Sequence, residues 1–130
     1  MTQTNTPAPA SMTATPLCDQ LRKLGEWNSA WDPIHALDPQ WTEKFIDMGT
    51  LPMRRGVLDA KTVEFLAIAV DASCTHLYGP GVRRHIRKAL DLGATREEIT
   101  AVLQLVSVLG IHSVALGAPM LVDELAREQP

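Results

Sequence analysis

One stretch of the sequence, residues 71–90, gathers most of the side chains whose types could do chemistry. It is "DASCTHLYGPGVRRHIRKAL", with Cys74, His76, Tyr78 and His85 around a Gly-Pro-Gly segment. The chain has only four histidines and two cysteines, so this concentration points to a site. Imidazole exchanges protons near neutral pH, and a cysteine thiolate is a nucleophile. The stretch therefore predicts acid–base, nucleophilic or metal-binding chemistry; the alternative is the polar end of two packed helices.

His85 is the strongest candidate for a general acid or base. It lies at the edge of the apolar stripe of its helix, where an imidazole can be desolvated and still reach a ligand. Glu64 is the only charged residue in "VEFLAIAV", and a carboxylate in so apolar a helix needs a histidine or arginine partner. The alternatives are a core histidine bonded to the backbone and a glutamate that faces solvent.

Two further histidines are expected to join this pair. Because Pro80 breaks the helix and its flanking glycines allow a tight turn, His76 and His85 are predicted to converge on one pocket. His112 lies in "LGIHSVALG", where small residues allow close backbone approach. We therefore expect His76 and His112 to line the pocket that contains His85 and Glu64.

Two other chemistries stay open at this point. His76, His85 and His112, with Glu64 as a fourth ligand, suit zinc, iron or nickel, although no two of these histidines have the i, i+4 spacing of a preformed helical pair. Cys74 flanks the turn, and a neighbouring histidine or arginine would favour its reactive thiolate. The alternatives to acid–base catalysis are therefore a metal-dependent enzyme and a single-cysteine redox protein.

Basic residues occupy the outward positions of the His85 helix. Most of them are expected at a solvated or intersubunit face, but Arg84 or Arg87 can hold a substrate carboxylate, because guanidinium binds carboxylate through two hydrogen bonds. Tyr78, Arg84 and Arg87 are therefore the candidate substrate-binding residues. The expected partner is a small-molecule carboxylate, and the chemistry requires no cofactor.

Helices must position these residues, because no segment shows a convincing alternating strand pattern and five segments show helical spacing. The fold is predicted to be all-α. Asp38 is expected to cap the start of a helix that ends at Gly49. The segment "TREE", from Thr95 to Glu98, is a capping box that marks the start of another helix. The predicted helices are residues 17–24, 38–49, 59–72, 79–92 and a last stretch from 95, interrupted at Gly110 and at 117–119.

Composition sets the wider limits. With 12 basic and 15 acidic residues the net charge is −3, which argues against a nucleic-acid partner. Residues 1–16 contain no charged side chain and no apolar run, so they are predicted to be a disordered tail before a single domain, 17–130. The most apolar segment is taken as 63–70, which is too short for a membrane span. We expect a cytoplasmic protein with no membrane partner.

The third predicted helix points to self-association. After Glu64 it contains "FLAIAV", which is apolar on all sides, and such a helix must be covered all round. The other helices of a chain this short cannot cover it alone. The protein is therefore predicted to be a homo-oligomer.

The segment "RRHIRKALDLGATREEITAVLQL" is similar to the central stretch of the carboxymuconolactone decarboxylase family, with a His-x-Arg-x-Ala helix, a glycine, and Thr-x-x-Glu-Ile at the start of the next helix. The segment "KTVEFLAIAV" resembles the family's preceding helix, so the resemblance covers about residues 58–121. It implies an all-helical, alkylhydroperoxidase D-like bundle that assembles as trimers or hexamers, with sites near subunit contacts.

The family includes a cofactor-free lactone decarboxylase of aromatic catabolism and the alkylhydroperoxidase D branch. That branch uses a glutamate, which Glu64 matches, and a Cys-x-x-Cys-x-x-x-His motif. If His85 matches its histidine, Tyr78 and Gly81 occupy the two cysteine positions, so dithiol peroxidase chemistry is not implied. The resemblance implies a small lyase that acts on a carboxylated lactone or a related aromatic-catabolism intermediate by decarboxylation or proton transfer, with His85 as the acid–base group.

Overall fold

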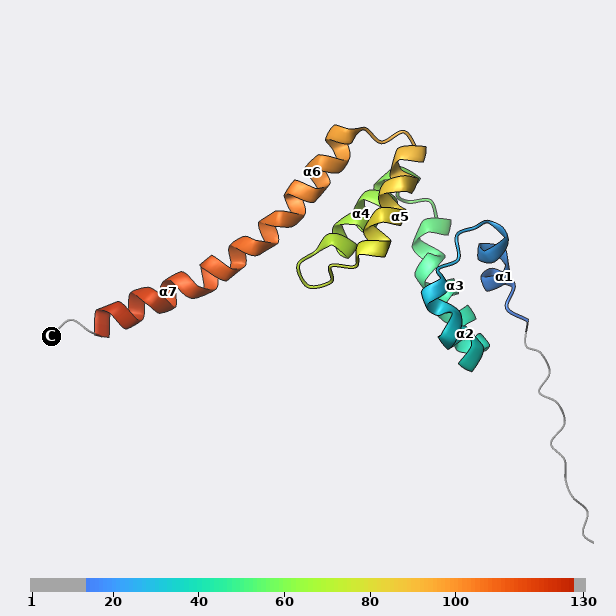
Figure 1. Cartoon of the computed structure of the whole chain (residues 1–130), viewed down its shortest axis with the longest axis horizontal. Helices are drawn as coiled ribbons and strands as arrows, with labels where there is room; N and C mark the ends of the chain where they lie inside the picture. The colour runs from blue at the N-terminus through green and yellow to red at the C-terminus, as the bar shows by residue number, and fades with distance from the viewer. Residues whose placement is uncertain (1–13, 128–130) are drawn as a thin grey trace, which may run out of the picture. The chain divides into compact units, whose positions relative to one another are not determined.

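The computed structural model describes residues 14–127, and within that range every regular element is a helix (Figure 1). The all-α prediction is confirmed. The sequence predicts one domain, 17–130, whereas the contacts divide the chain into two compact units, one that ends at Arg55 and one that begins at Gly56. The predicted tail, 1–16, lies largely outside the described residues. In its described part, Thr15 is buried and Pro16 begins the first helix.

In the first unit, the capping residue of the longest helix was predicted correctly and its end was not. The Asp38 side chain accepts the backbone N–H of Trp41 at 2.9 Å. The helix then continues through Gly49, because it packs against the two helices before it and one interior glycine costs only about 1 kcal/mol. The segment between the predicted helices 17–24 and 38–49 also contains helices. The elements are α1 (Pro16–Lys23), η1 (Ser29–Trp31), α2 (Asp32–Leu37) and α3 (Pro39–Arg54).

A carboxylate from α3 fixes the start of α1. The two oxygens of Glu43 accept the backbone N–H groups of Leu17, at 2.7 Å, and Cys18, at 3.0 Å. Partial burial opposes ionisation, but these hydrogen bonds outweigh it, so the pKa of Glu43 lies below its ordinary value of 4.5. Burial, together with the Glu43 carboxylate, raises the pKa of Cys18 to about 12, which makes this thiol unreactive.

The stability of the first unit is expected to fall in acid. Because the folded-state pKa of Glu43 is lowered, its contribution to the free energy of unfolding is fully present above pH 4.5 and is lost as the pH falls through the folded-state pKa. Thermal unfolding measured from neutral pH downward should show the Tm falling in this range. Glu43→Gln should lower the Tm at neutral pH and flatten the fall. An equal fall in both proteins would assign the pH dependence to other carboxylates.

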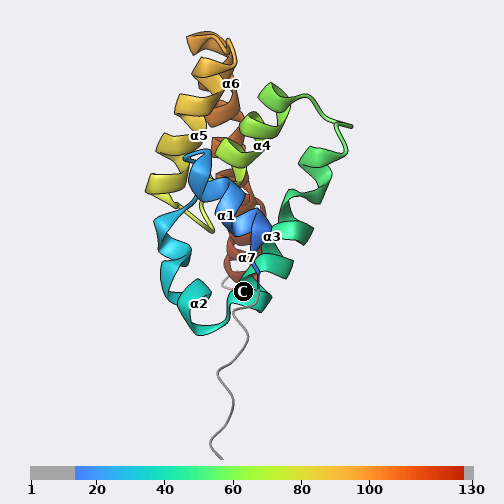
Figure 2. The same ribbon diagram turned by 90° about the vertical axis from the view of Figure 1, so that its right-hand side faces the viewer.

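The second unit is built around α4, which packs against α5 and α6. Helices α4 and α5 lie side by side in both views (Figures 1 and 2). A small apolar core of Ile68, Ala89, Ala94 and Ile99 joins the three helices, and the side chains around it are only partly buried. The elements are α4 (Ala60–Ala72), α5 (Gly79–Asp91), α6 (Arg96–Ser107), η2 (Val108–Gly110) and α7 (Ile111–Arg127).

Capping interactions fix the starts of α4 and α6. The predicted capping box is confirmed: the Thr95 hydroxyl accepts the Glu98 N–H at 3.1 Å, and the Glu98 carboxylate accepts the Thr95 N–H at 2.8 Å. The Asp59 carboxylate accepts the Thr62 N–H at 3.0 Å. Lys61 Nζ donates to Glu98 Oε1 at 2.9 Å, which ties the beginnings of the two helices together.

The chain from Arg96 to Arg127 forms one long helical segment. The interruption predicted at Gly110 corresponds to η2, a 3-10 turn between α6 and α7. The interruption predicted at 117–119 is wrong, because α7 runs through Gly117 and Pro119. No residue of α7 is buried. By length and composition this segment is apolar enough to cross a membrane, with a mean hydropathy of 2.0 over its most apolar window, of which 6% is buried. This window is longer than residues 63–70, which were taken as the most apolar part of the sequence, and it reaches the length that a membrane span requires.

The reversal between α4 and α5 does not use the Gly-Pro-Gly segment. Gly79 and Pro80 belong to the first turn of α5, whereas the chain reverses over residues 73–78. Leu77 has φ of 48°, a left-handed conformation that is strained for a residue with a Cβ atom. The helix predicted over 79–92 thus begins at Gly79 as expected, but the break between the two helices lies before Pro80 and not at it. Pro80 stands in the first turn of α5, where its missing N–H needs no partner.

Candidate active site

His85 of α5 and Glu64 of α4 form a short hydrogen-bonded pair. His85 Nδ1 lies 2.6 Å from Glu64 Oε2. The two side chains are 21% and 9% exposed, so water screens their interaction only weakly. Glu64 thus has the histidine partner that its apolar surroundings predict, and the alternative of a solvent-facing glutamate is excluded.

The pair determines which nitrogen of His85 is free for chemistry. With Glu64 ionised, Nδ1 carries a proton and donates it to the carboxylate. The Arg84 guanidinium, which can only donate, lies 3.3 Å from His85 Nε2. Nε2 is therefore an acceptor in this arrangement, and it is the atom at which His85 can take up and release a proton.

Asp71, which was not predicted from the sequence, belongs to the same cluster. Its Oδ2 lies 3.8 Å from His85 Nε2, and its Oδ1 lies 3.4 Å from His76 Nε2. The spacing held a signal for it: Asp71 follows Glu64 by two helical turns, so both carboxylates lie on the same face of α4.

Lys88 is the second residue that the sequence prediction missed. Its Nζ lies 3.8 Å from Glu64 Oε1, so the buried carboxylate has an ammonium neighbour as well as the imidazole. Lys88 follows His85 by three residues on α5, and residues at this spacing are neighbours on a helix surface. The sequence prediction had placed it only among the outward basic residues.

The turn before α5 holds His76 and Tyr78 against Asp71. The rings of His76 and Tyr78 lie 5.8 Å apart, and the Tyr78 N–H donates to the Asp71 carbonyl at 2.7 Å. Gly81 provides the necessary room, because a Cβ atom there would lie 1.8 Å from Asp71 Oδ2. The turn thus brings His76 and His85 to the two oxygens of one carboxylate. The predicted convergence on one pocket is not met in this form, because His76, Tyr78 and His85 do not line the pocket that runs along α5.

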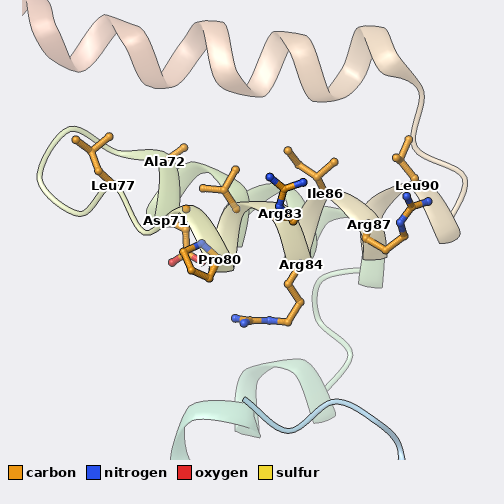
Figure 3. A pocket seen from close by; sticks show the side chains of 11 residues that line it. Asp71, Ala72, Leu77, Pro80, Arg83, Arg84, Ile86, Arg87 and Leu90 are labelled. Carbon is orange, nitrogen blue, oxygen red and sulfur yellow. The ribbon is translucent and has the colours of Figure 1, made fainter. Parts of the chain in front are cut away.

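A pocket of about 840 Å³ runs along α5 beside this cluster, and its volume suits a small ligand (Figure 3). Asp71 and Arg84 belong both to the pocket wall and to the cluster, whereas His85 and Glu64 do not line the pocket. Figure 3 shows Ile86 and Arg84 pointing to opposite sides of α5. The lining combines apolar side chains with three arginines: Asp71, Ala72, Leu77, Gly79, Pro80, Val82, Arg83, Arg84, Ile86, Arg87 and Leu90.

His112 and Cys74 stand apart from the cluster within one chain. His112 is exposed on α7, and the described chain contains no hydrogen bond or ion pair between it and His76 or His85. Cys74 is an exposed free thiol in the turn. The expected convergence of His112 with the other histidines is therefore not met by a single chain.

The structure brings together no ready-made metal-ligand set within residues 14–127. No three histidine, cysteine, aspartate or glutamate side chains in that range are grouped so that they could hold a metal ion. The three histidines of the metal hypothesis, His76, His85 and His112, do not converge in one chain. The cluster that does form is an alternating series of imidazoles and carboxylates, an arrangement suited to proton transfer.

Comparison with known proteins gives two matches to this architecture. The model of the carboxymuconolactone decarboxylase family matches residues 39–116. A similar solved structure is that of a protein from Burkholderia xenovorans described as a candidate gamma-carboxymuconolactone decarboxylase subunit, with 46% sequence identity and a TM-score of 0.75. The match covers 86% of this chain and 45% of that one, so this chain spans less than half the length of that protein. No curated protein matches the chain.

Proposed function

The chain belongs to the carboxymuconolactone decarboxylase family, and we propose that it is a cofactor-free lyase that removes CO2 from a carboxylated lactone, with His85 as the proton donor. One observation carries the proposal: a 2.6 Å His85–Glu64 pair lies beside a pocket lined by three arginines. The pocket supplies charge for an anionic substrate, and the pair supplies the acid–base group.

Arginines of the pocket would hold the substrate. Arg84 and Arg87 both line it, and a guanidinium binds a carboxylate through two parallel hydrogen bonds. Arg84 also reaches His85 Nε2, so a carboxylated carbon held by Arg84 would lie near the proton donor. Apolar side chains such as Ile86 and Leu90 would contact the rest of the lactone.

The chemical step is a heterolytic cleavage followed by a proton transfer. The bond between the substrate carbon and its carboxylate breaks, CO2 leaves, and the electron pair remains on the substrate as an enolate-like carbanion. Cationic groups near this charge lower the barrier, and Arg84 is the cation next to the proposed donor. Protonated His85 then gives its Nε2 proton to the carbon, which leaves a neutral imidazole.

Glu64 would orient the imidazole throughout this step. Its hydrogen bond to Nδ1 keeps Nε2 directed at the substrate, and its negative charge stabilises the imidazolium form that donates the proton. Lys88, which is close to the other oxygen of Glu64, would help hold this carboxylate in place.

Product analysis tests the reaction class. Purified protein incubated with carboxymuconolactone should release one CO2 for each lactone consumed, with a product lighter by that mass. Consumption of the lactone without CO2 release would replace decarboxylation with isomerisation, and no consumption would contradict the substrate class.

We also propose that the protein works as a homo-oligomer, for which the family resemblance implies a trimer or hexamer. Helices α6 and α7 with η2 expose eleven large apolar side chains that are each 39–72% accessible. They lie on successive turns of one helical segment, so they form a continuous apolar surface. Monomers rarely expose an apolar patch above about 600 Å², and a stable interface uses about 800 Å² per partner. A groove of about 620 Å³ lined by uncharged residues of α4, α6 and the segments that follow them adjoins this surface.

Sedimentation is expected to give a mass that is a multiple of 14.2 kDa. Leu105→Glu, which places a charge in the groove, should shift the protein toward the monomer, because an unpaired charge at an apolar contact is costly. Thr100→Glu, an exposed change on the same helix, is the matched control. A wild-type mass of 14.2 kDa at micromolar concentration would contradict the proposal. A monomer that also sediments with lipid vesicles would assign the apolar helix to a membrane.

A further inference from the structure

We propose that Asp71 and His76 form a proton relay that connects His85 to solvent. The inference rests on the proposed function, because each decarboxylation consumes one proton that His85 must recover before the next turnover. It concerns two residues that are not needed to break the carbon–carbon bond.

The contacts link the three side chains in sequence. The Asp71 carboxylate presents one oxygen to each imidazole, Oδ1 at 3.4 Å from His76 Nε2 and Oδ2 at 3.8 Å from His85 Nε2. The first separation is that of a weak hydrogen bond, and the second is one that a single water or a small rotation of the carboxylate can bridge. The second distance ends at His85 Nε2, the nitrogen that Glu64 leaves free.

The outer end of the series is its exposed member. Glu64 and His85 are 9% and 21% exposed, Asp71 is 14% exposed, and His76 is 51% exposed. His76 is therefore the member that exchanges protons freely with water, while His85 lies behind the Asp71 carboxylate. A histidine suits this outer position because it exchanges protons near neutral pH.

Local backbone features hold the relay in place. Leu77, in a strained left-handed conformation, follows His76 directly, and such strain persists only when the surrounding structure fixes it. The Tyr78 N–H donates to the Asp71 carbonyl, and the absence of a Cβ atom at Gly81 leaves room for the carboxylate. The turn that looked like a break between two helices thus positions the outer histidine.

The proton balance of the relay is simple. After His85 has given its Nε2 proton to the product carbon, protonated His76 passes its Nε2 proton to Asp71 Oδ1. The neutral Asp71 carboxyl then rotates so that its protonated oxygen faces His85 and gives that same proton to His85 Nε2. Neutral His76 takes a new proton from water or a buffer acid. No other reactant is required.

Chemical rescue tests the relay with carboxymuconolactone as the substrate. In dilute non-imidazole buffer, His76→Gln should lower kcat about tenfold and leave KM unchanged, because the loss is in proton return and not in binding. Added imidazole should restore kcat in this variant and leave the wild type unaffected. Asp91→Asn, an exposed change at the end of α5, is the control and should match the wild type. A His76→Gln enzyme with wild-type kcat in dilute buffer, or with a loss that imidazole does not restore, would overturn the relay.

A second measurement separates the relay from the proposed reaction. The exchange of the His85 ring N–H with water, followed by nitrogen-edited NMR, needs no substrate. It should be slower in His76→Gln and Asp71→Asn than in the wild type and Asp91→Asn, and imidazole should restore it in His76→Gln. If the wild type does not decarboxylate the lactone, the proposed function fails while this exchange still decides the relay. Equal exchange in all four proteins would overturn it.

Discussion

Replacement of His85 by glutamine is expected to lower kcat by about 10²-fold or more, the range over which a positioned general acid contributes. Glutamine is similar in size to histidine and can still donate a hydrogen bond to Glu64, so the packing of α5 against α4 should persist. It cannot carry a proton to a carbanion. The loss should therefore fall on kcat, with little change in KM, because the arginines that hold the carboxylate are unchanged.

Circular dichroism and sedimentation should show that His85→Gln keeps the fold and the assembly of the wild type. Asp91→Asn should keep both structure and rate, since this carboxylate is exposed at the end of the same helix. A His85→Gln enzyme with near wild-type turnover would leave the His85–Glu64 pair as a packed polar contact without a catalytic role.

The second large effect is expected for Glu64→Gln, with a loss in kcat of about 10²-fold. The amide of glutamine can donate to Nδ1, which favours the tautomer with the proton on Nε2 and removes the charge that stabilises imidazolium. Glu64→Asp keeps the charge and shortens the side chain, so it should retain more activity than Glu64→Gln. A strongly downfield proton resonance from the 2.6 Å bond should be present in the wild type and absent in Glu64→Gln. Equal activity of the two variants would show that the charge of Glu64 is not used.

The central part of the site could be predicted because its residues are chemically unusual where they stand. Glu64 is a lone carboxylate in an apolar helix, and a buried charge needs a partner, so burial predicted a histidine or arginine beside it, and the structure places His85 there. The helix starts at Asp38 and Thr95 followed from local capping chemistry. Such features depend on a few neighbouring residues and on no distant contact.

The missed residues needed tertiary information. Asp71 lies at the end of α4, where a carboxylate can simply face water. Its role appears only when the turn folds His76 back and Gly81 lets α5 approach. Lys88 was placed among outward charges because its reach toward Glu64 depends on how α4 and α5 pack. The sequence signal for Asp71 was its helical spacing from Glu64, and the signal for Lys88 was its helical spacing from His85.

Glycine and proline were given too much weight as helix ends. Gly49 and Gly117 lie inside helices, and Pro80 begins one. An interior glycine costs about 1 kcal/mol, which packing or a long apolar surface can outweigh. The exposure of α7 was not predicted, because the sequence does not show that the rest of a single chain leaves this helix uncovered.

The most direct test of the account is one decarboxylation experiment in D2O, with CO2 release and deuterium in the product measured together for the wild type and His85→Gln. The wild type should release one CO2 per carboxymuconolactone, and each product molecule should carry one deuterium, delivered from His85. His85→Gln should do both about 10²-fold more slowly or worse. Release of CO2 by His85→Gln at the wild-type rate, with the same deuterium content, would contradict the assignment of His85 as the proton donor.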